Sequence, residues 1–334
     1  MTIVKAEPES LPIFAQHSLT PELHPPRFRH VRCAICGADR YERVGRPRVE
    51  VRFRSALMTR TVSIVKCKRC GFFYAQPMPL WDLEALQKIY GQDYFPEMST
   101  WWQAEKTTRN PRRRLDRLEY HARCPIRTFL EVGCGLGHGM RAALQRGWAV
   151  YGQEVSSTFA DAVKSALGIE VFLGFLEEAK YPDQYFDAIY LDSVLEHLPN
   201  PLDMLRELRR ILSPQGVLFI TVTNQAALVS RVSGTVSKAL CLGTSPVLSP
   251  FAYPYHLVGF SGQTLRIACD RVGFEVKELV IRAGTQEWRK LALPELTGKA
   301  LITTMLSQPL YLLGERLGQG IALEAVLGHA EHPG

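Results

Sequence analysis

The segment that most constrains the fold of this chain is a glycine-rich turn that follows a short apolar run. Residues 127–132 read Arg-Thr-Phe-Leu-Glu-Val, which suits a buried strand, and glycines occupy every second position from Gly133 to Gly139. A helical pattern begins at Met140. Glycine permits positive φ angles and close approach of the backbone to a ligand, and a helix start leaves N–H groups free to bind it. The segment therefore predicts a strand, a tight turn and a helix that cradle a nucleotide-type ligand.

The spacing of the glycines distinguishes between nucleotide classes. A dinucleotide site needs Gly-x-Gly-x-x-Gly, but the sixth position is histidine when counted from Gly133 and methionine when counted from Gly135. An NAD site is therefore not favoured. Residues 149–154 form a second apolar run that ends in Glu154, about 20 residues after the first glycine, where a carboxylate can accept hydrogen bonds from both ribose hydroxyls. We expect Glu154 to hold the ribose, whereas a lone glycine motif would fit an ordinary tight turn.

Strand and helix patterns alternate from residue 129 onward, which is typical of a parallel sheet covered on both faces by helices. Helices are expected at about 139–146, from Ser156 or Ser157 to 167, after the Asn200-Pro201 cap, and at 263–272. Further strands are expected at 169–173, 186–192, 217–222, from 273 and at 322–327.

Three phrases carry a family resemblance: Glu131-x-Gly133-x-Gly135-x-Gly137, residues 192–200 and residues 210–216. They resemble motifs of the class I methyltransferases that use S-adenosylmethionine (SAM), and the resemblance covers about residues 129–225. It implies an α/β fold with a seven-stranded, doubly wound, Rossmann-like sheet, and a methyltransferase activity with SAM as the methyl donor. The cofactor-binding positions that it implies are Glu131, Gly133, Cys134, Gly135, Gly137, Glu154, Val155, Gly174, Phe175, Leu176, Asp192 and Ser193.

Four of the eight cysteines form two Cys-x-x-Cys pairs, Cys33/Cys36 and Cys67/Cys70, each followed by glycine. With no secretion signal, such pairs favour a metal over disulfides, and four thiolates complete the tetrahedral set of a structural Zn²⁺ site. Residues 49–53 and 61–65 alternate like the strands of a hairpin, so we expect a zinc ribbon with a long hairpin. The alternative is four reduced, unligated cysteines. The scattered Cys124, Cys134, Cys241 and Cys269 are expected to be small buried side chains.

Positive charge is concentrated at the N-terminal end. Residues 1–128 hold 23 Lys and Arg against 13 Asp and Glu, whereas residues 129–334 hold 17 against 20. A basic lobe suits phosphorylated substrates, nucleic acid or a membrane surface, and equally a solvated face. In the basic helix around 112–120 we expect Leu115, Leu118 and Tyr120 to pack near the cofactor mouth, with the arginines in water or holding a phosphate.

The organisation expected along the chain is a flexible lead-in (1–30), a zinc ribbon (31–78), a helical linker or substrate-side segment (79–126) and a SAM-dependent methyltransferase domain (127–334) with a lid at about 225–260. No apolar run reaches the roughly 18 residues that span a bilayer, so we expect no membrane span and a cytoplasmic protein. The apolar residues 301–313, interrupted by Pro309, favour a helix packed on the fold over membrane contact. Nothing in the sequence indicates an oligomeric state.

Two histidines are candidates for the catalytic base, because the unperturbed pKa of histidine lies near neutrality. His256 follows two tyrosines in a segment that resembles the one supplying the base in bacterial sugar C-methyltransferases, which also carry an N-terminal zinc ribbon; those enzymes have glutamate where this chain has Tyr255. His197 lies in a Glu-His pair that resembles that of ubiquinone-type O-methyltransferases. Those enzymes have an acid where this chain has Ser193, so no catalytic metal is expected. Glu196-His197 could equally serve only to hold the strand-to-helix turn.

Three functions remain open from the sequence. The first is methyl transfer to an oxygen or carbon of a small-molecule acceptor such as a sugar, a nucleotide-linked sugar, a lipid-linked or an aromatic compound. The second is an RNA methyltransferase that grips phosphates through the ribbon and basic lobe. No stacking platform or lysine-rich face is evident, so a nucleic acid partner is not expected. The third is a non-catalytic SAM-binding assembly protein, which would have no need of Glu154 and the glycines.

Overall fold

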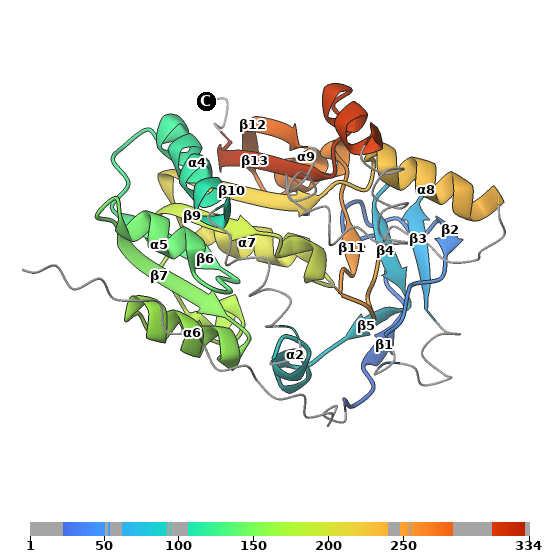
Figure 1. The fold of residues 1–334 in the computed structure, drawn as a ribbon, viewed down its shortest axis with the longest axis horizontal. Helices are drawn as coiled ribbons and strands as arrows, with labels where there is room; N and C mark the ends of the chain where they lie inside the picture. Colours follow the sequence, from blue (N-terminus) through green and yellow to red (C-terminus); the bar gives the residue numbers. More distant parts are fainter. Residues whose placement is uncertain are drawn as a thin grey trace, which may run out of the picture.

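The computed structural model describes residues 23–50, 53, 62–91, 94, 106–239, 248–253, 255–282 and 309–330 of the 334-residue chain. Its largest element is a seven-stranded sheet in the order β12-β13-β10-β9-β6-β7-β8 (Figure 1), which confirms the predicted α/β fold. The strands are β6 (Thr128–Val132), β7 (Ala149–Glu154), β8 (Phe172–Leu173), β9 (Phe186–Asp192), β10 (Leu212–Thr223), β12 (Phe274–Arg282) and β13 (Ala322–His329).

The sheet is mixed rather than parallel throughout. β13 lies between β10 and β12 and runs antiparallel to both, whereas the pairs among β10, β9, β6, β7 and β8 are parallel. The parallel sheet that the alternating pattern indicated therefore contains one antiparallel strand. An apolar run of residues fits a buried strand in either direction, so the pattern could not reveal the direction of β13.

Helices cover both faces of this sheet, and alternate residues of each strand face opposite layers. In β6, Phe129 packs with Leu115 and Leu118 on one face, whereas Leu130 shares the other core with Leu205. The helices are α2 (Leu83–Ile89), α4 (Lys106–His121), α5 (His138–Leu144), α6 (Ser157–Leu167), α7 (Pro201–Ile211), α8 (Leu228–Ala239), α9 (Gly262–Arg271) and residues 309–316, with 3-10 turns η2 (Leu176–Ala179) and η3 (Leu195–His197).

The predicted helix caps are confirmed. The Ser156 side chain accepts a hydrogen bond from the Phe159 N–H, and Gly168 ends α6 with a φ of 71°. Asn200 caps α7, and Pro201 occupies its first turn. The third strand is shorter than expected, because only residues 172–173 of the run 169–173 pair with β7.

A second, four-stranded sheet carries the cysteine pairs, in the order β11-β4-β3-β2 (Figure 1). Its strands are β2 (Tyr41–Gly45), β3 (Ser63–Cys67), β4 (Phe73–Gln76) and β11 (Val258–Gly259); β1 (Arg27–Arg29) and β5 (Met78–Leu80) pair beside it. β3 pairs with β2, so the predicted hairpin between residues 49–53 and 61–65 was wrong. Val49 instead bridges Phe251, since a period-two pattern indicates an extended segment without naming its partner.

The predicted lid falls partly in the described chain. It includes α8 and a segment, 248–253 and 255–260, whose end forms β11 in the ribbon sheet; residues 240–247 and 254 lie outside the described residues. Of the apolar stretch 301–313, residues 301–308 also lie outside them, and residues 309–316 are helical. The predicted domain boundaries stay a prediction. Among the helices that the structure describes, none is long and apolar enough to cross a membrane.

Candidate active site

The glycine turn lies at the carboxyl end of β6, and its geometry requires glycine at particular positions. Gly133, Gly135 and Gly137 have φ values of 61°, 50° and 68°. A Cβ atom on Gly133 would come within 2.7 Å of the Val194 side chain, whereas a Cβ on Gly135 would meet no atom within 4 Å. The turn is therefore closed on the side of β9 and has open space above Gly135, where a ligand has room.

Glu131 faces the start of α5. Its carboxylate accepts hydrogen bonds from the Gly139 N–H at 3.3 Å and the Met140 N–H at 2.7 Å, and a Cβ on Gly139 would lie 2.8 Å from it. Burial raises the pKa of Glu131 to about 8, while the two N–H donors favour the ionised form. The fourth glycine is thus explained by this helix contact. That Glu131 also contacts the cofactor stays a prediction.

Glu154, at the end of β7, binds back to the glycine turn. Its Oε2 accepts from the Gly135 N–H at 2.8 Å, and its Oε1 accepts from Val155 and Ser156 at 2.7 and 3.0 Å. The sequence analysis did not predict a role for the neighbouring Gln153. Its side chain accepts from the Gly133 N–H at 3.2 Å and donates to the Gly174 carbonyl, so it joins the turns after β6 and β8. A buried amide in an apolar strand was the available signal.

The remaining predicted cofactor positions lie at the same edge of the sheet. The Cys134 N–H donates to the Gln153 carbonyl at 3.1 Å, and the Gly174 N–H donates to the Glu154 carbonyl at 3.0 Å. Leu176 is fully buried in the core, while Phe175 is half-buried beside it. Ser193 has a φ of 60° and is exposed at the end of β9. The structure thus gathers these residues, and their contacts with a cofactor stay predictions.

Asp192 belongs to a charged seam between α4 and the sheet. The Arg114 guanidinium binds the carboxylates of Asp192 and Glu324, and Arg117 binds Glu324 at 2.6 Å and Glu278 at 2.9 Å. The expectation that the arginines of this helix lie in water was therefore wrong for Arg114 and Arg117. Acids within the apolar strands β12 and β13 were the signal, because an acid buried in a sheet needs a cation.

Tyr120 was also placed wrongly. It is 84% exposed, whereas Leu115 and Leu118 are buried as expected. Positions 115 and 118 lie on the sheet-facing side of α4, and position 120 lies about 170° around the helix from the midpoint between them by helical geometry. The aromatic ring therefore points away from the fold.

Both candidate catalytic histidines lie together at the carboxyl edge of the sheet. The His197 and His256 rings meet edge to face, with centroids 4.9 Å apart. The Tyr90 hydroxyl lies 2.9 Å from Nδ1 of His197, and the Tyr90 carbonyl accepts from the Ser156 hydroxyl at 2.7 Å. Tyr90 thus connects the histidines to the turn after Glu154. No local pattern indicated this contact, because it joins residues 107 positions apart.

The pKa values of the two imidazoles are lowered by burial. The pKa of His197 falls to about 4, and that of His256 falls well below its usual value because of burial and the neighbouring His197. Both rings are therefore neutral near pH 7, which is the form that can accept a proton.

The cysteine-bearing module supports the segment that carries His256. The Ala75 N–H donates to the Leu257 carbonyl at 3.0 Å, immediately after His256. The Glu50 carboxylate accepts hydrogen bonds from the Tyr253 N–H at 2.6 Å and the Tyr255 hydroxyl at 3.0 Å. Tyr255 has a φ of 62°, which is strained for a residue other than glycine. The ribbon therefore holds the strained turn before the histidine.

Removing the Tyr255 hydroxyl tests this support. Tyr255→Phe keeps the ring and removes the hydrogen bond from the Tyr255 hydroxyl to the Glu50 carboxylate, so we expect the free energy of unfolding to fall by about 1–3 kcal/mol. Denaturant unfolding measures it. Tyr151→Phe is the control, because its hydroxyl contacts Tyr185 on the exposed surface, and we expect a change within about 0.5 kcal/mol. Equal stability of Tyr255→Phe and the wild type would contradict this role.

The four predicted metal ligands come together. The sulfurs of Cys33 and Cys70 are 3.5 Å apart, those of Cys36 and Cys67 are 3.4 Å apart, and all four lie within 4.8 Å of one another. Zn–S bonds of about 2.3 Å in a tetrahedron place sulfurs about 3.8 Å apart, so the cluster has the dimensions of a metal site. Gly37 and Gly71 have φ values of 72° and 82°, and each N–H donates to the carbonyl of the first cysteine of its pair.

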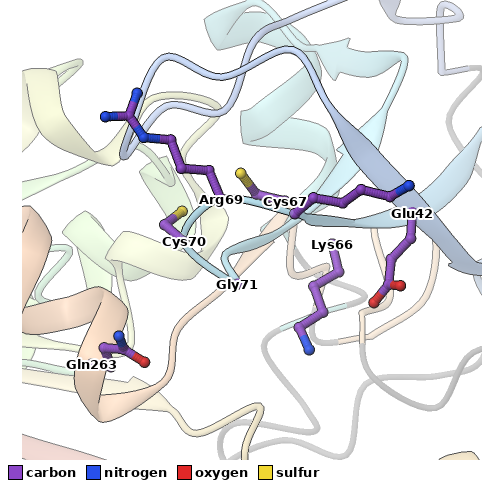
Figure 2. Close-up of a pocket in the computed structure, with 8 residues that line it drawn as sticks. Glu42, Lys66, Cys67, Arg69, Cys70, Gly71 and Gln263 are labelled. Atoms are coloured by element: carbon purple, nitrogen blue, oxygen red, sulfur yellow. The ribbon is translucent and has the colours of Figure 1, made fainter.

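An open pocket lies beside the second cysteine pair, opposite Gln263 of α9 (Figure 2). It has cationic residues in its lining, but Figure 2 shows the Lys66 and Arg69 side chains extending away from each other. Cations that diverge do not form a convergent anion site. The pocket is therefore a surface depression beside the cysteine cluster.

Comparisons with known proteins place the chain in a family. A model described as "Methyltransferase domain" matches residues 130–220. The ubiquinone biosynthesis O-methyltransferase of Klebsiella pneumoniae subsp. pneumoniae is 30% identical over 183 residues, which cover 50% of this chain and 74% of that protein. The protein of the same name from Pasteurella multocida is 27% identical over 213 residues, covering 56% and 87%. A SAM dependent methyltransferase structure from Archaeoglobus fulgidus has a TM-score of 0.49 at 18% identity and covers 71% of this chain and 99% of that chain.

The seven-stranded sheet with a glycine turn after β6 and an acid at the end of β7 defines a nucleotide-binding α/β enzyme. Together with the matches to methyltransferases, it identifies the chemistry as methyl transfer. The chain belongs to the class I SAM-dependent methyltransferases.

Proposed function

We propose that this enzyme transfers the methyl group of SAM to an oxygen or carbon of a small-molecule acceptor, with His256 as the proton acceptor. The observation that carries the proposal is the pair of buried, neutral imidazoles at the same edge of the sheet as the glycine turn. Methyl transfer needs alignment of donor and acceptor, and an acceptor hydroxyl or acidic C–H must also lose a proton. A neutral histidine at this edge supplies that function.

The residues at the sheet edge fit a nucleoside. The space above Gly135 admits a ligand, and Glu154 presents a carboxylate beside it from the next strand. Glu154 would accept hydrogen bonds from the ribose hydroxyls, with the turns at 133–137, 174–176 and 192–193 around it. When bound, SAM supplies an activated methyl group on a positively charged sulfur. The chain's own residues then need only orient the acceptor and take its proton.

His256 is the better base of the two histidines. Nδ1 of His197 is already engaged by the Tyr90 hydroxyl at 2.9 Å, which suits a supporting role. The His256 side chain is 13% exposed, so an acceptor can reach it while water is largely excluded. Its Tyr255 neighbour is held by Glu50, which fixes the segment before the base.

Aromatic rings beside the histidines suit an acceptor with a flat or apolar face. The Tyr94 ring lies 5.0 Å from that of Tyr253 and 5.1 Å from that of Tyr90 between centroids, and Tyr94 also contacts Phe159 of α6. Such rings stack on an aromatic compound or on the apolar face of a sugar. From this cluster of aromatic rings we infer an aromatic or sugar acceptor.

We further propose that the four cysteines hold a structural Zn²⁺. Four thiolates close the tetrahedral shell, so the ion has no open position for a substrate. Its function is then to fold the ribbon that supports the His256 segment.

RNA methylation is a second candidate that one observation favours. Within residues 23–50 and 62–80 there are ten Lys and Arg against three acids, and none of the ten forms an ion pair with a described residue. These cations are Arg27, Arg29, Arg32, Arg40, Arg43, Arg46, Arg48, Lys66, Lys68 and Arg69. A steep loss of activity with salt would support RNA, because phosphate contacts release counterions. A weak salt dependence supports the small acceptor.

A screen of acceptors with labelled SAM tests the proposed reaction, and Glu154→Gln tests the cofactor site. The amide keeps the size of the side chain and removes its charge, so we expect the Kd for SAM to rise about 10- to 100-fold. Calorimetry gives the Kd. Glu170→Gln, which changes an exposed carboxylate, is the control and leaves the Kd unchanged. An unchanged Kd in Glu154→Gln would remove Glu154 from the site.

A further inference from the structure

Glu196 is buried beside His256, although it adjoins His197 in the sequence. It lies in η3 directly after β9, and its side chain is 1% exposed. Its Oε1 accepts hydrogen bonds from the N–H and the hydroxyl of Thr223, at 3.2 and 3.3 Å. Its Oε2 has no hydrogen-bond partner among the described residues. A buried carboxyl oxygen without a partner is costly, which points to a use beyond the anchoring of the turn.

The structure holds this carboxyl group and the imidazole in a fixed relation. Nε2 of His256 lies 4.0 Å from Oε1 of Glu196. The Leu257 N–H donates to the Glu196 carbonyl at 2.8 Å, which ties the residue after His256 to the backbone of Glu196. A small side-chain movement closes 4.0 Å to a hydrogen bond, and catalytic contacts are often long before the substrate binds.

The other groups around the pair leave Glu196 as the carboxyl group placed for this contact. His197 packs edge to face on His256, and its own Nδ1 lies against the Tyr90 hydroxyl. Tyr255, next to His256, directs its hydroxyl to Glu50. Asp192 acts on Glu196 only through its charge, and its carboxylate is bound by Arg114. Among the described residues, Glu196 is the acid that lies within ion-pair distance of His256.

We propose that Glu196 is a positioning residue that accepts the Nε2–H of His256 and so leaves Nδ1 free to take the acceptor's proton. This inference rests on the proposed function. As the new bond from the acceptor to the methyl carbon forms and the carbon–sulfur bond breaks, the acceptor's O–H or C–H bond breaks and its proton forms an N–H bond at Nδ1. The sulfonium charge is lost, and the imidazolium charge that appears is balanced by the carboxylate.

Because Glu196 and His256 interact, the pKa for the first proton that they bind belongs to the pair and not to either residue alone. Burial raises the pKa of Glu196 to about 7 and lowers that of His256. A proton on His256 removes the free Nδ1 that would take the proton of the methyl acceptor. A proton on Glu196 removes the negative charge that stabilises the imidazolium. We therefore expect kcat/KM to fall as the pH drops below about 7.

Glu196→Gln tests the inference through two effects of different direction. The amide still accepts from Thr223 but carries no charge, so we expect the plateau of kcat to fall about 10- to 100-fold with the KM for SAM unchanged. Loss of the neighbouring negative charge lowers the pKa of His256, so the acidic limb of kcat/KM moves about one pH unit or more lower. Damage to the fold alone would not move this limb to lower pH.

Thr223→Val is the matched control, because it removes the hydroxyl that anchors the same oxygen and keeps the carboxylate. It should not move the acidic limb to lower pH, because loss of a hydroxyl that lowers the pKa of Glu196 moves the limb, if at all, to higher pH. The inference would be overturned if Glu196→Gln changed neither the plateau of kcat nor the acidic limb of kcat/KM. It would also be overturned if Thr223→Val moved the acidic limb to lower pH by as much as Glu196→Gln. In either case His256 could still be the base. If wild-type protein transferred no methyl group to any acceptor, or His256→Ala kept full activity, the proposed function would fail instead.

The tautomer of His256 provides a test that needs no acceptor. In ¹⁵N-histidine-labelled protein above the acidic limb, NMR should show His256 protonated at Nε2 and not at Nδ1, with the signal assigned by its loss in His256→Gln. Protonation at Nδ1 instead would overturn the inference, whatever the acceptor is.

Discussion

Replacing His256 by alanine is expected to lower methyl-transfer turnover about 100- to 10,000-fold, the usual loss when a general base is removed. The affinity for SAM should stay as in the wild type, because the described contacts of His256 involve Glu196 and His197 and none of the glycine turn. Single-turnover rates with labelled SAM measure the first quantity, and calorimetry measures the second.

His197→Ala separates the two histidines. Nδ1 of His197 already lies against the Tyr90 hydroxyl, so we expect a smaller loss of turnover than for His256→Ala. The loss arises because Tyr90 and the His256 ring are no longer held in position. Equal losses in the two variants would leave the base unassigned between them and contradict the choice of His256. Full activity in both would show that neither histidine takes the proton.

Removal of the metal from the cysteine cluster is the second change with a large expected effect. Structural Zn²⁺ contributes about 10–16 kcal/mol to the folding of zinc-finger peptides, so Cys36→Ser or chelation should unfold the ribbon. The ribbon strand β4 pairs with β11, and Glu50 holds Tyr253 and Tyr255. We therefore expect turnover to be lost together with the metal, while SAM still binds to the separate glycine turn.

Elemental analysis, turnover and calorimetry on the same samples check this prediction. Cys124→Ser is the matched control, because Cys124 is a free cysteine away from the cluster, and it should keep both metal and turnover. Wild-type protein without one bound metal per chain would contradict the site. Full turnover of metal-free protein would contradict the support of His256 by the ribbon.

Much of the fold follows from local patterns in the sequence. Local patterns predicted the glycine turn, the acid at the end of β7, the caps at Ser156 and Asn200 and the two cysteine pairs, because each depends on neighbouring residues. Strand existence was predictable for the same reason, since burial on both faces produces an apolar run.

What the sequence did not show are contacts between distant segments. Val49 pairs with Phe251 rather than in a hairpin, and β13 runs antiparallel, because a period-two or apolar pattern carries no information on partner or direction. Glu50, Tyr90 and Arg114 gain their contacts only when the chain has folded. Site residues that directly follow or end a strand were predictable. Contacts that the ribbon or α4 makes with the site were not.

The account depends on a nucleoside cradle formed by the turn at 133–137 and Glu154, and titration calorimetry of SAM into metal-loaded wild-type protein tests it most directly. The account predicts one SAM bound per chain, with binding weakened in Glu154→Gln. Absence of binding by SAM and by its demethylated product, in folded protein, would contradict it.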